Sequence, residues 1–447
     1  MDNKLFYRRM VSLALPIALQ NLLSSCGYLV DTAMVVGLGN VATSAIGVAS
    51  RWSFLTNIAV FGVCSGCSAL SAQYWGAGDK ENVRKASGMA ISAVALLSAL
   101  YIVAAIAFPR FMMSIFTSEA DVISAGAGYI SMASFNMLFS GLALAFAMSM
   151  RSTGDVKSPF VASAAAVAVN IFFNYALING HFGFPRMGIR GAALATVISG
   201  FVQLAVTIGL ALAKKSVFLG TAGQMFGWGR DFIKKYASLA LPILFNEILW
   251  ALGTTIYSMV LARQGSENYS GYTIFNSIHE VFFVFFVGLC NACAIMIGMT
   301  IGENKLEEAY KMAKKYLATI FFMSVFLGAA QILLREPILS LMNIETEGAH
   351  RVASQLLVMH GILMPLVNLP YVAVVGVFRA GGDAKYGFFV DTFSVYAIGI
   401  PILVYAAYMT DATFVQMVTA MYLGEYVLKT VLCLLRFKSR KWIRRLV

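Results

Sequence analysis

The sequence predicts an all-α membrane protein with twelve transmembrane helices in two six-helix lobes that are related by a parallel internal repeat. Three observations lead to this fold class: the composition, the recurring apolar runs and the repeated motifs. Hydrophobic residues make up 59% of the 447-residue chain and charged residues only 12%, and the mean hydropathy is +0.77. A soluble domain typically carries about 25% charged residues. The composition therefore excludes a soluble protein and a disordered chain.

Apolar runs of at least about 18 residues recur along the whole chain, and each can cross ~30 Å of hydrocarbon as a helix. They predict twelve spans, centred near residues 24, 60, 97, 135, 169, 200, 246, 285, 321, 362, 397 and 424. Of the 33 lysines and arginines, 25 lie in one alternating set of connections and five in the opposite set. The positive-inside rule then places both termini in the cytoplasm, in a multi-pass protein of the cell inner (plasma) membrane. The net charge of +12 thus reflects topology, and no nucleic-acid partner is expected.

The chain contains an internal repeat. Its clearest signs are pairs of motifs at a nearly constant separation: Ala14–Pro16 with Ala240–Pro242, Gly62–Cys67 with Gly288–Cys293, and Met150–Lys157 with Phe378–Lys385. Because each half holds an even number of spans, both halves cross the membrane in the same orientation. We expect an N-lobe over residues 1–213, a cytoplasmic linker over 214–230 and a C-lobe over 231–447. Two homologous bundles of this kind suit alternating access.

These motifs resemble those of multidrug and toxic compound extrusion (MATE) transporters of the bacterial type. The first span, ALPIALQNLLSSCGYLVDTAMVVGLGN, resembles the opening helix of the family, with Pro16, Asp31 and Gly37 in place. RSTGD and FRAGGD resemble the cytoplasmic ends of its helices four and ten, and ALPILFNEILWALG resembles helix seven. Residues 170–196 resemble helices five and six with their outer loop. The resemblance implies a secondary active exporter of organic, often cationic compounds that runs on an inward sodium or proton gradient.

Asp31 is the first candidate for ion coupling, because a carboxylate in an apolar helix is costly and is usually functional. Helical spacing places it on one stripe with Gln20, Ser24 and Gly27, a polar face that suits a cavity. Such a carboxyl group can exchange a proton, or bind sodium when ionised. The alternative is a buried acid that anchors a neighbouring helix.

Asn170 and Asn174 lie one turn apart on the fifth span, and with Thr196 on the sixth they are expected to face Asp31. In the resembled family this corner of the N-lobe forms the cation or proton site. Some members carry an aspartate where Asn174 falls, so the present site has one acid fewer. Hydrogen bonding between helices is the alternative role for these side chains.

Glu247 is the second candidate acid, five residues after Pro242. It begins a helical stripe whose aromatic side chains suit a lipophilic cation; the stripe continues with Trp250, Thr254 and Tyr257. In the sodium-coupled branch of the family, the acid on helix seven works with another on helix ten. Asn368 stands at the corresponding position here. Proton coupling is therefore favoured over sodium, although a single carboxyl group can serve either ion.

The remaining polar residues within spans have more general interpretations. We assign Gln20, Glu247, Trp250, Tyr257, Glu280 and Asn368 to the substrate cavity, with the role of Glu280 open. His360 is interpreted as a helix contact, with a cavity position as the alternative. Helix pairing is the interpretation for the other ionisable residues within spans: Arg51, Asp391, Glu425 and Lys429.

Two motifs are assigned structural roles. Arg151 with Asp155 and Arg379 with Asp383 are expected to cap helices and form salt bridges at the inner gate, and Pro16 and Pro242 are assigned structural roles within their own helices. The pairs Cys64/Cys67 and Cys290/Cys293 lack a third or fourth ligand, so packing is expected and no metal.

The sequence therefore predicts a monomeric antiporter for small organic cations that uses H⁺ or Na⁺ and no cofactor. A flippase for lipids or lipid-linked sugars, from the related superfamily, is the alternative; it would need basic cavity residues to hold pyrophosphate. A membrane-embedded enzyme is a further alternative, but its clustered ligands are not found.

Overall fold

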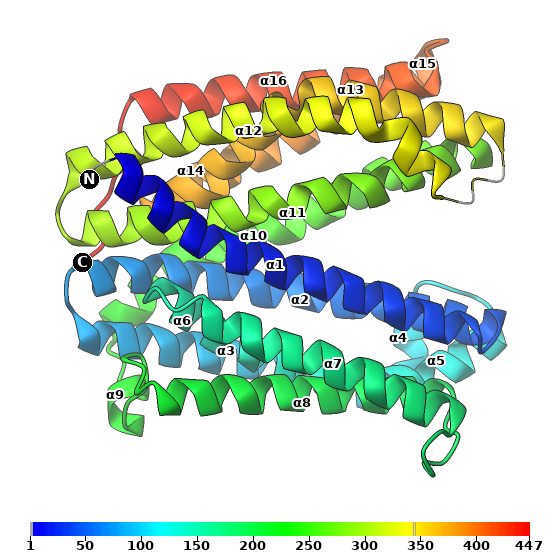
Figure 1. Cartoon of the computed structure of the whole chain (residues 1–447), viewed down its shortest axis with the longest axis horizontal. Helices are drawn as coiled ribbons and strands as arrows, with labels where there is room; N and C mark the ends of the chain where they lie inside the picture. The colour runs from blue at the N-terminus through cyan, green and yellow to red at the C-terminus, as the bar shows by residue number, and fades with distance from the viewer. Residues whose placement is uncertain (1–2, 343, 345) are drawn as a thin grey trace. The chain divides into compact units, whose positions relative to one another are not determined.

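The structure is a computed structural model that describes residues 3–342, 344 and 346–447, and the regular elements in this part of the chain are all helices (Figure 1). The described residues form two compact units. Unit 2 spans Leu19–Leu244, and unit 1 contains the chain up to Ala18 together with Phe245–Val447. The lobes expected at 1–213 and 231–447 follow the sequence repeat, whereas both unit boundaries fall inside helices.

The two helices that contain these boundaries are α1 (Asn3–Val36) and α10 (Arg230–Ala262). The boundary in α1 follows Ala18, two residues after Pro16. The boundary in α10 follows Leu244, two residues after Pro242. Proline removes a backbone donor and disturbs the helix that contains it. Each half of the repeat therefore opens with a helix whose two ends belong to different units.

Unit 2 contains the rest of the first half. Its helices are α2 (Asn40–Gly76), α3 (Lys80–Ala107), α4 (Pro109–Ser114), α5 (Ala120–Ala133), α6 (Phe135–Ser152), α7 (Lys157–Asn179), α8 (Ile189–Ala213) and the short α9 (Ala222–Phe226). The helices α5 and α6 meet at a bend of 41° and are together long enough for one span. Helix α9 lies in the connection between α8 and α10.

Unit 1 contains the rest of the second half. Its helices are α11 (Ser266–Gly302), α12 (Leu306–Ser340), α13 (Glu347–Tyr371), α14 (Ala384–Phe393), α15 (Ile400–Met409) and α16 (Phe414–Lys438). Two π-helical segments, η1 (Val372–Phe378) and η2 (Ser394–Gly399), continue α13 and join α14 to α15. Segments of this type commonly mark functional sites.

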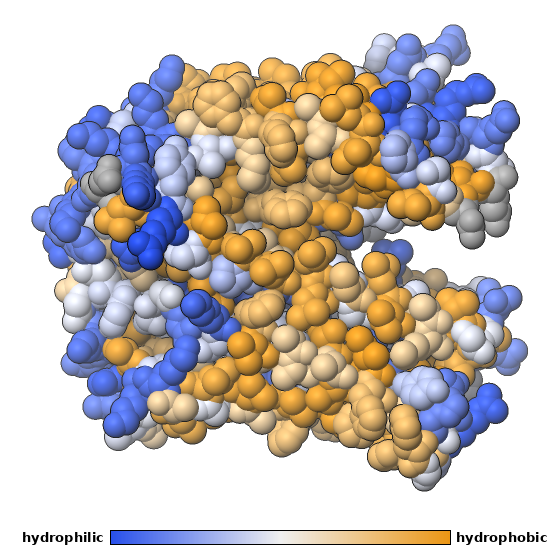
Figure 2. Space-filling view, in the orientation of Figure 1, coloured by the Kyte–Doolittle hydropathy of each residue, from blue (hydrophilic) through white to orange (hydrophobic). Residues whose placement is uncertain are grey.

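The predicted all-α membrane fold is confirmed. In the described part of the chain, eleven helices are long and apolar enough to cross a membrane, and the bent pair α5–α6 raises the number to twelve. Each unit shows an apolar band between hydrophilic helix ends (Figure 2). Within unit 1 the two chain ends lie at the same end of the helices (Figure 1): Lys315 of α12 donates to Asn3 at 2.6 Å, and Arg440 pairs with Glu307.

Small residues allow neighbouring helices to approach closely, as is usual in membranes. A Cβ atom at Gly328 of α12 would lie 2.2 Å from the carbonyl oxygen of Gly361 on α13, so only glycine fits there. Polar caps define helix starts outside the apolar band: Asp79 accepts from the Asn82 amide at the start of α3, and Thr413 forms a capping box with Gln416 at the start of α16.

Candidate functional site

The Asp31 carboxylate of α1 lies against α7 within unit 2. Its Oδ1 accepts a hydrogen bond from Asn174 Nδ2 at 2.6 Å. The Asn170 amide, with its nitrogen turned towards the carboxylate, lies 3.1 Å from Asp31 Oδ2. Both asparagines are buried, while Asp31 is partly buried. The structure thus brings together the acid and the two amides that the sequence predicts, and no ion pair to Asp31 occurs among the described residues.

A tyrosine near Asp31 contacts the predicted Thr196, and among the described residues no direct contact of Thr196 with Asp31 is found. Tyr129 of α5 lies near the Asp31 carboxylate and its hydroxyl contacts Thr196 on α8. Thr196 itself donates to the Ala192 carbonyl of its own helix at 2.9 Å. Tyr129 could not be predicted as a member of this site from the sequence. It lies on α5, and the spacing of residues along one helix does not show which other helices pack against it.

The arginine of the RSTGD motif reaches α1 rather than its neighbouring aspartate. Arg151 Nη2 donates to Gln20 Oε1 at 2.6 Å, and both side chains are buried. Asp155 instead accepts from the Ser158 amide at 3.1 Å and from the Ser158 hydroxyl at 2.7 Å, and pairs with Lys214 at 2.9 Å. Burial alone would raise the pKa of Asp155, but the hydrogen bonds from Ser158 and Lys214 outweigh it and lower the pKa.

The FRAGGD motif of unit 1 shows the same division of roles. Arg379 Nη2 lies 2.6 Å from Glu247 Oε1 in a salt bridge whose side chains are only 3% and 14% exposed. Asp383 pairs with Arg436 at 2.7 Å and with Arg444 of the C-terminal segment at 3.1 Å. In both motifs the arginine thus contacts the proline-containing helix of the same half, α1 or α10. The aspartate pairs with a basic residue near the C-terminal end of α8 or α16.

The other predicted cavity residues of unit 1 make contacts of their own. Trp250 is 42% exposed, whereas Tyr257 is buried and donates to Glu425 Oε2 at 2.8 Å. Glu280 on α11 is exposed. Asn368 is buried and its amide donates to the Met364 carbonyl of its own helix at 3.0 Å. These residues therefore have separate surroundings.

His360 packs inside unit 1. Its ring centroid lies 4.4 Å from that of His279, edge to face, and its Nδ1 lies 3.2 Å from Gln331 Nε2. The cysteine pairs Cys64/Cys67 and Cys290/Cys293 are fully buried. Gly376 packs against Cys293 Sγ, and Cys67 Sγ lies 3.2 Å from the Ala86 carbonyl oxygen. Within the described ranges no group of three or more histidine, cysteine or acidic side chains could hold a metal ion.

The repeated pattern of these contacts agrees with a comparison to known families. The MatE family model matches residues 16–176 and again residues 242–405, so the two matches begin at Pro16 and Pro242, the prolines of the repeated motif. Together they cover well over half of the chain. The chain belongs to the MatE family. It is a multi-pass membrane transporter and not an enzyme.

Curated relatives align over nearly the full length. The chain is 22% identical to the "Probable multidrug resistance protein NorM" of Thermotoga maritima, over 98% of this chain and 94% of that protein. It is 26% identical to the "Probable multidrug resistance protein YoeA" of Bacillus subtilis, over 89% and 86%. The crystal structure of the Vibrio cholerae MATE transporter VcmN in the bent form shares the fold, with a TM-score of 0.86 at 15% identity and coverage of 98% and 97%.

Proposed function

We propose that this MatE protein is a secondary active antiporter that exports lipophilic organic cations in exchange for protons. The observation that carries the proposal is the Asp31 carboxylate, which lies within a span and is held by Asn174 and Asn170 without a basic partner among the described residues. An acid in this environment is expensive to ionise. It is therefore a natural group to bind a proton on one side of the membrane and release it on the other.

Proton coupling is preferred to sodium because each half offers few free carboxylate oxygens. In unit 2 the partners of Asp31 are amides, which supply no further negative charge. In unit 1 the acid of α10, Glu247, is already compensated by Arg379. A sodium ion at Glu247 would have to compete with that guanidinium, whereas a proton on Asp31 displaces no ion pair.

The export of drug-like compounds rests on the names of NorM and YoeA, which describe those proteins as probable multidrug resistance proteins. The flippase alternative finds less support. It requires cationic groups for a pyrophosphate, and two basic side chains buried in unit 1, Arg379 and Lys429, are paired with Glu247 and Asp391. By the positive-inside rule we place the protein in the cell inner membrane with cytoplasmic termini, and we propose that it works as a monomer.

Purified full-length protein in liposomes loaded with ethidium tests this function. A pH gradient or a sodium gradient is imposed at clamped membrane potential, and dye movement is followed. We expect movement with the pH gradient, its loss in Asp31→Asn, and normal movement in the matched control Asp411→Asn, which changes an exposed loop acid in the same way.

The outcomes separate the alternatives. Dye movement with sodium alone would replace the proton by sodium in this proposal. Gradient-driven movement in well-folded Asp31→Asn would remove Asp31 from coupling. No movement of the dye under either gradient, with a lipid probe translocated instead, would favour the flippase.

A further inference from the structure

Unit 1 contains a second buried acid site, far along the chain from Asp31. Lys429 Nζ of α16 lies 2.7 Å from Asp391 Oδ1 of α14, and Asn246 Nδ2 of α10 donates to Asp391 Oδ2 at 3.0 Å. One turn earlier on α16, Glu425 Oε2 accepts from the Tyr257 hydroxyl at 2.8 Å. All five residues are buried, with exposed fractions between 3% and 7%. Three helices thus meet at a charged cluster inside the apolar part of unit 1.

The charges in this cluster do not balance when both acids are ionised. Lys429 supplies one positive charge, and its ammonium is in contact with Asp391. Glu425 contacts the neutral hydroxyl of Tyr257, so the cluster would carry one excess negative charge. A buried uncompensated charge in a membrane span is costly. Binding one proton to Glu425 brings the cluster to zero charge without breaking the Lys429–Asp391 pair.

The internal repeat supports the assignment independently. Tyr257 follows Pro242 on α10 at the same interval at which Asp31 follows Pro16 on α1, so the two residues are equivalent in the repeat. At this position unit 2 carries an acid, Asp31, on the first helix of the first half. Unit 1 carries Tyr257, on the first helix of the second half, and its hydroxyl donates to Glu425 on the last helix, α16. In each unit, this position of the repeat takes part in a hydrogen bond between a carboxyl group and a neutral donor.

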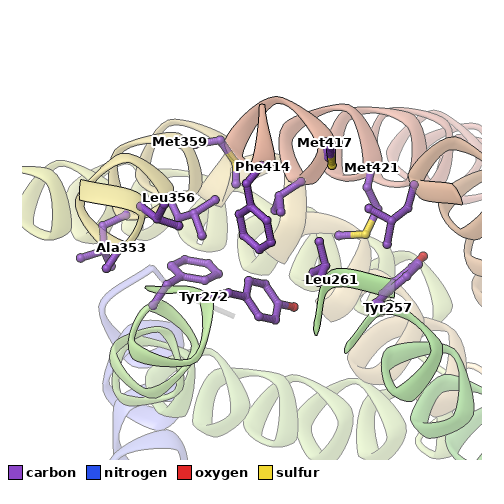
Figure 3. Packing of buried hydrophobic residues seen from close by; sticks show 14 of the residues in the cluster. Tyr257, Leu261, Tyr272, Ala353, Leu356, Met359, Phe414, Met417 and Met421 are labelled. Carbon is purple, nitrogen blue, oxygen red and sulfur yellow. The ribbon is translucent and has the colours of Figure 1, made fainter. Parts of the chain in front are cut away.

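The backbone is shaped to admit this contact. A Cβ atom at Gly399, the last residue of η2, would lie 2.0 Å from the Tyr257 hydroxyl and 3.1 Å from Glu425 Oε2. Only glycine therefore lets the π-helical segment pass beside the pair. Tyr257 also belongs to the hydrophobic cluster that contains Leu261 and Met421, which limits the access of water (Figure 3).

We propose that Glu425 is a second proton-binding site of this transporter, formed with Tyr257, Asp391 and Lys429 in unit 1. The proton binds to a carboxylate oxygen of Glu425, and the cluster then changes from one net negative charge to zero. The titratable groups that face Glu425 are Lys429 and Asp391, with the tyrosine hydroxyls of Tyr257, Tyr272, Tyr422 and Tyr426. The site depends on the geometry of unit 1 alone and stands whether or not Asp31 couples transport.

Infrared difference spectroscopy of the full-length protein, titrated from acidic to alkaline pH, tests the site without any substrate. We expect a carboxylic C=O band that disappears as the pH rises, is absent in Glu425→Gln, and persists in Asp31→Asn and Asp411→Asn. Tyr257→Phe keeps the acid but removes its donor, so the band should move to higher frequency. This second variant keeps the test valid if Glu425→Gln fails to fold.

Three results would overturn the proposal. The first is a Glu425→Gln titration that superimposes on that of the native protein. The second is a band that is lost in Asp391→Asn but retained in Glu425→Gln, which would place the proton on Asp391. The third is a band that Tyr257→Phe does not move, which would show that the titrating carboxyl group is not the one bonded to Tyr257.

Discussion

Arg379 reaches back across 132 residues of sequence to hold Glu247, with 2.6 Å between Nη2 and Oε1. In unit 2, Arg151 makes the equivalent contact to Gln20 at the same distance. Gln20 follows Pro16 by four residues, and Glu247 follows Pro242 by five. The two halves therefore share one contact between the motif arginine and the proline helix, but only unit 1 makes it a salt bridge.

This difference predicts unequal costs of removing the two arginines. Arg379→Gln leaves Glu247 as a largely enclosed unpaired carboxylate, 14% exposed, which should cost about 3–5 kcal/mol of unfolding free energy. Arg151→Gln leaves only an amide without its donor and should cost about 1–3 kcal/mol. Denaturant unfolding of the two variants in detergent measures both. Equal losses would show that the charge of Glu247 contributes nothing.

The double variant Glu247→Gln with Arg379→Gln should be more stable than Arg379→Gln alone. Two neutral amides can share a hydrogen bond, and neither leaves a buried charge. A double-mutant cycle gives the coupling energy between the two side chains. A coupling energy near zero would contradict the short contact seen in unit 1.

The lowered pKa of Asp155 predicts a pH-dependent contribution to stability. Because its folded pKa lies below the unfolded value of 3.8, the ionised group stabilises the folded protein above that value. The contribution is lost as the pH falls through the folded pKa. Asp155→Asn should therefore unfold at a lower temperature than the native protein near neutral pH. The gap should close on strong acidification, and a gap that widened with acid would reverse the assigned sign.

The stability cost of adding a methyl group at a glycine should depend on whether the nearest atom belongs to the backbone or to a flexible side chain. Gly88 and Gly126 offer one case of each. A Cβ atom at Gly88 would lie 2.1 Å from the backbone carbonyl oxygen of Met225 in α9, whereas one at Gly126 would lie 2.0 Å from the flexible end of the Met113 side chain. Gly88→Ala should cost about 1–3 kcal/mol and detach α9 from α3. Gly126→Ala should cost less, and the melting temperatures of the two variants provide the test.

The shared end of the two termini predicts their side of the membrane. Asn3 and Arg440 both contact the first turns of α12, and the basic residues are concentrated in the connections on their side. Green fluorescent protein fused after Val447 should therefore fluoresce in intact cells. Alkaline phosphatase fused after His181, beyond five spans, should be active outside. The opposite pattern would invert the topology.

Sequence periodicity is sufficient to predict the helices and the shared face of Asn170 and Asn174, and the resemblance to the family then implies that this face meets Asp31. Asn170 and Asn174 are one turn apart, so their spacing alone assigns them to one face of α7. The partners of charged residues cannot be found in this way. Arg379 and Glu247 lie on different helices, and a stripe of spacing 3.6 describes only one helix.

The same limit explains why the sequence groups Tyr257 with Glu247 in one cavity. Both belong to one stripe of α10, but the neighbouring helices offer them different partners, Arg379 and Glu425. The π-helical segments η1 and η2 are likewise beyond the reach of the sequence pattern. Proline lies beside each segment, Pro370 before η1 and Pro401 after η2, but proline also kinks or ends ordinary helices, so the sequence pattern alone does not indicate a π-helix.

The division of α1 and α10 between units has a consequence for how the chain folds during synthesis. Every residue of unit 2 has been made once Leu244 is added, whereas residues 3–18, which precede unit 2 in the chain, belong to a unit that only the second half completes. They must wait in the membrane until that half has been translated. A break in the connection around α9 would likewise leave two fragments, each holding a piece of the other's unit, so neither fragment contains a complete folding unit.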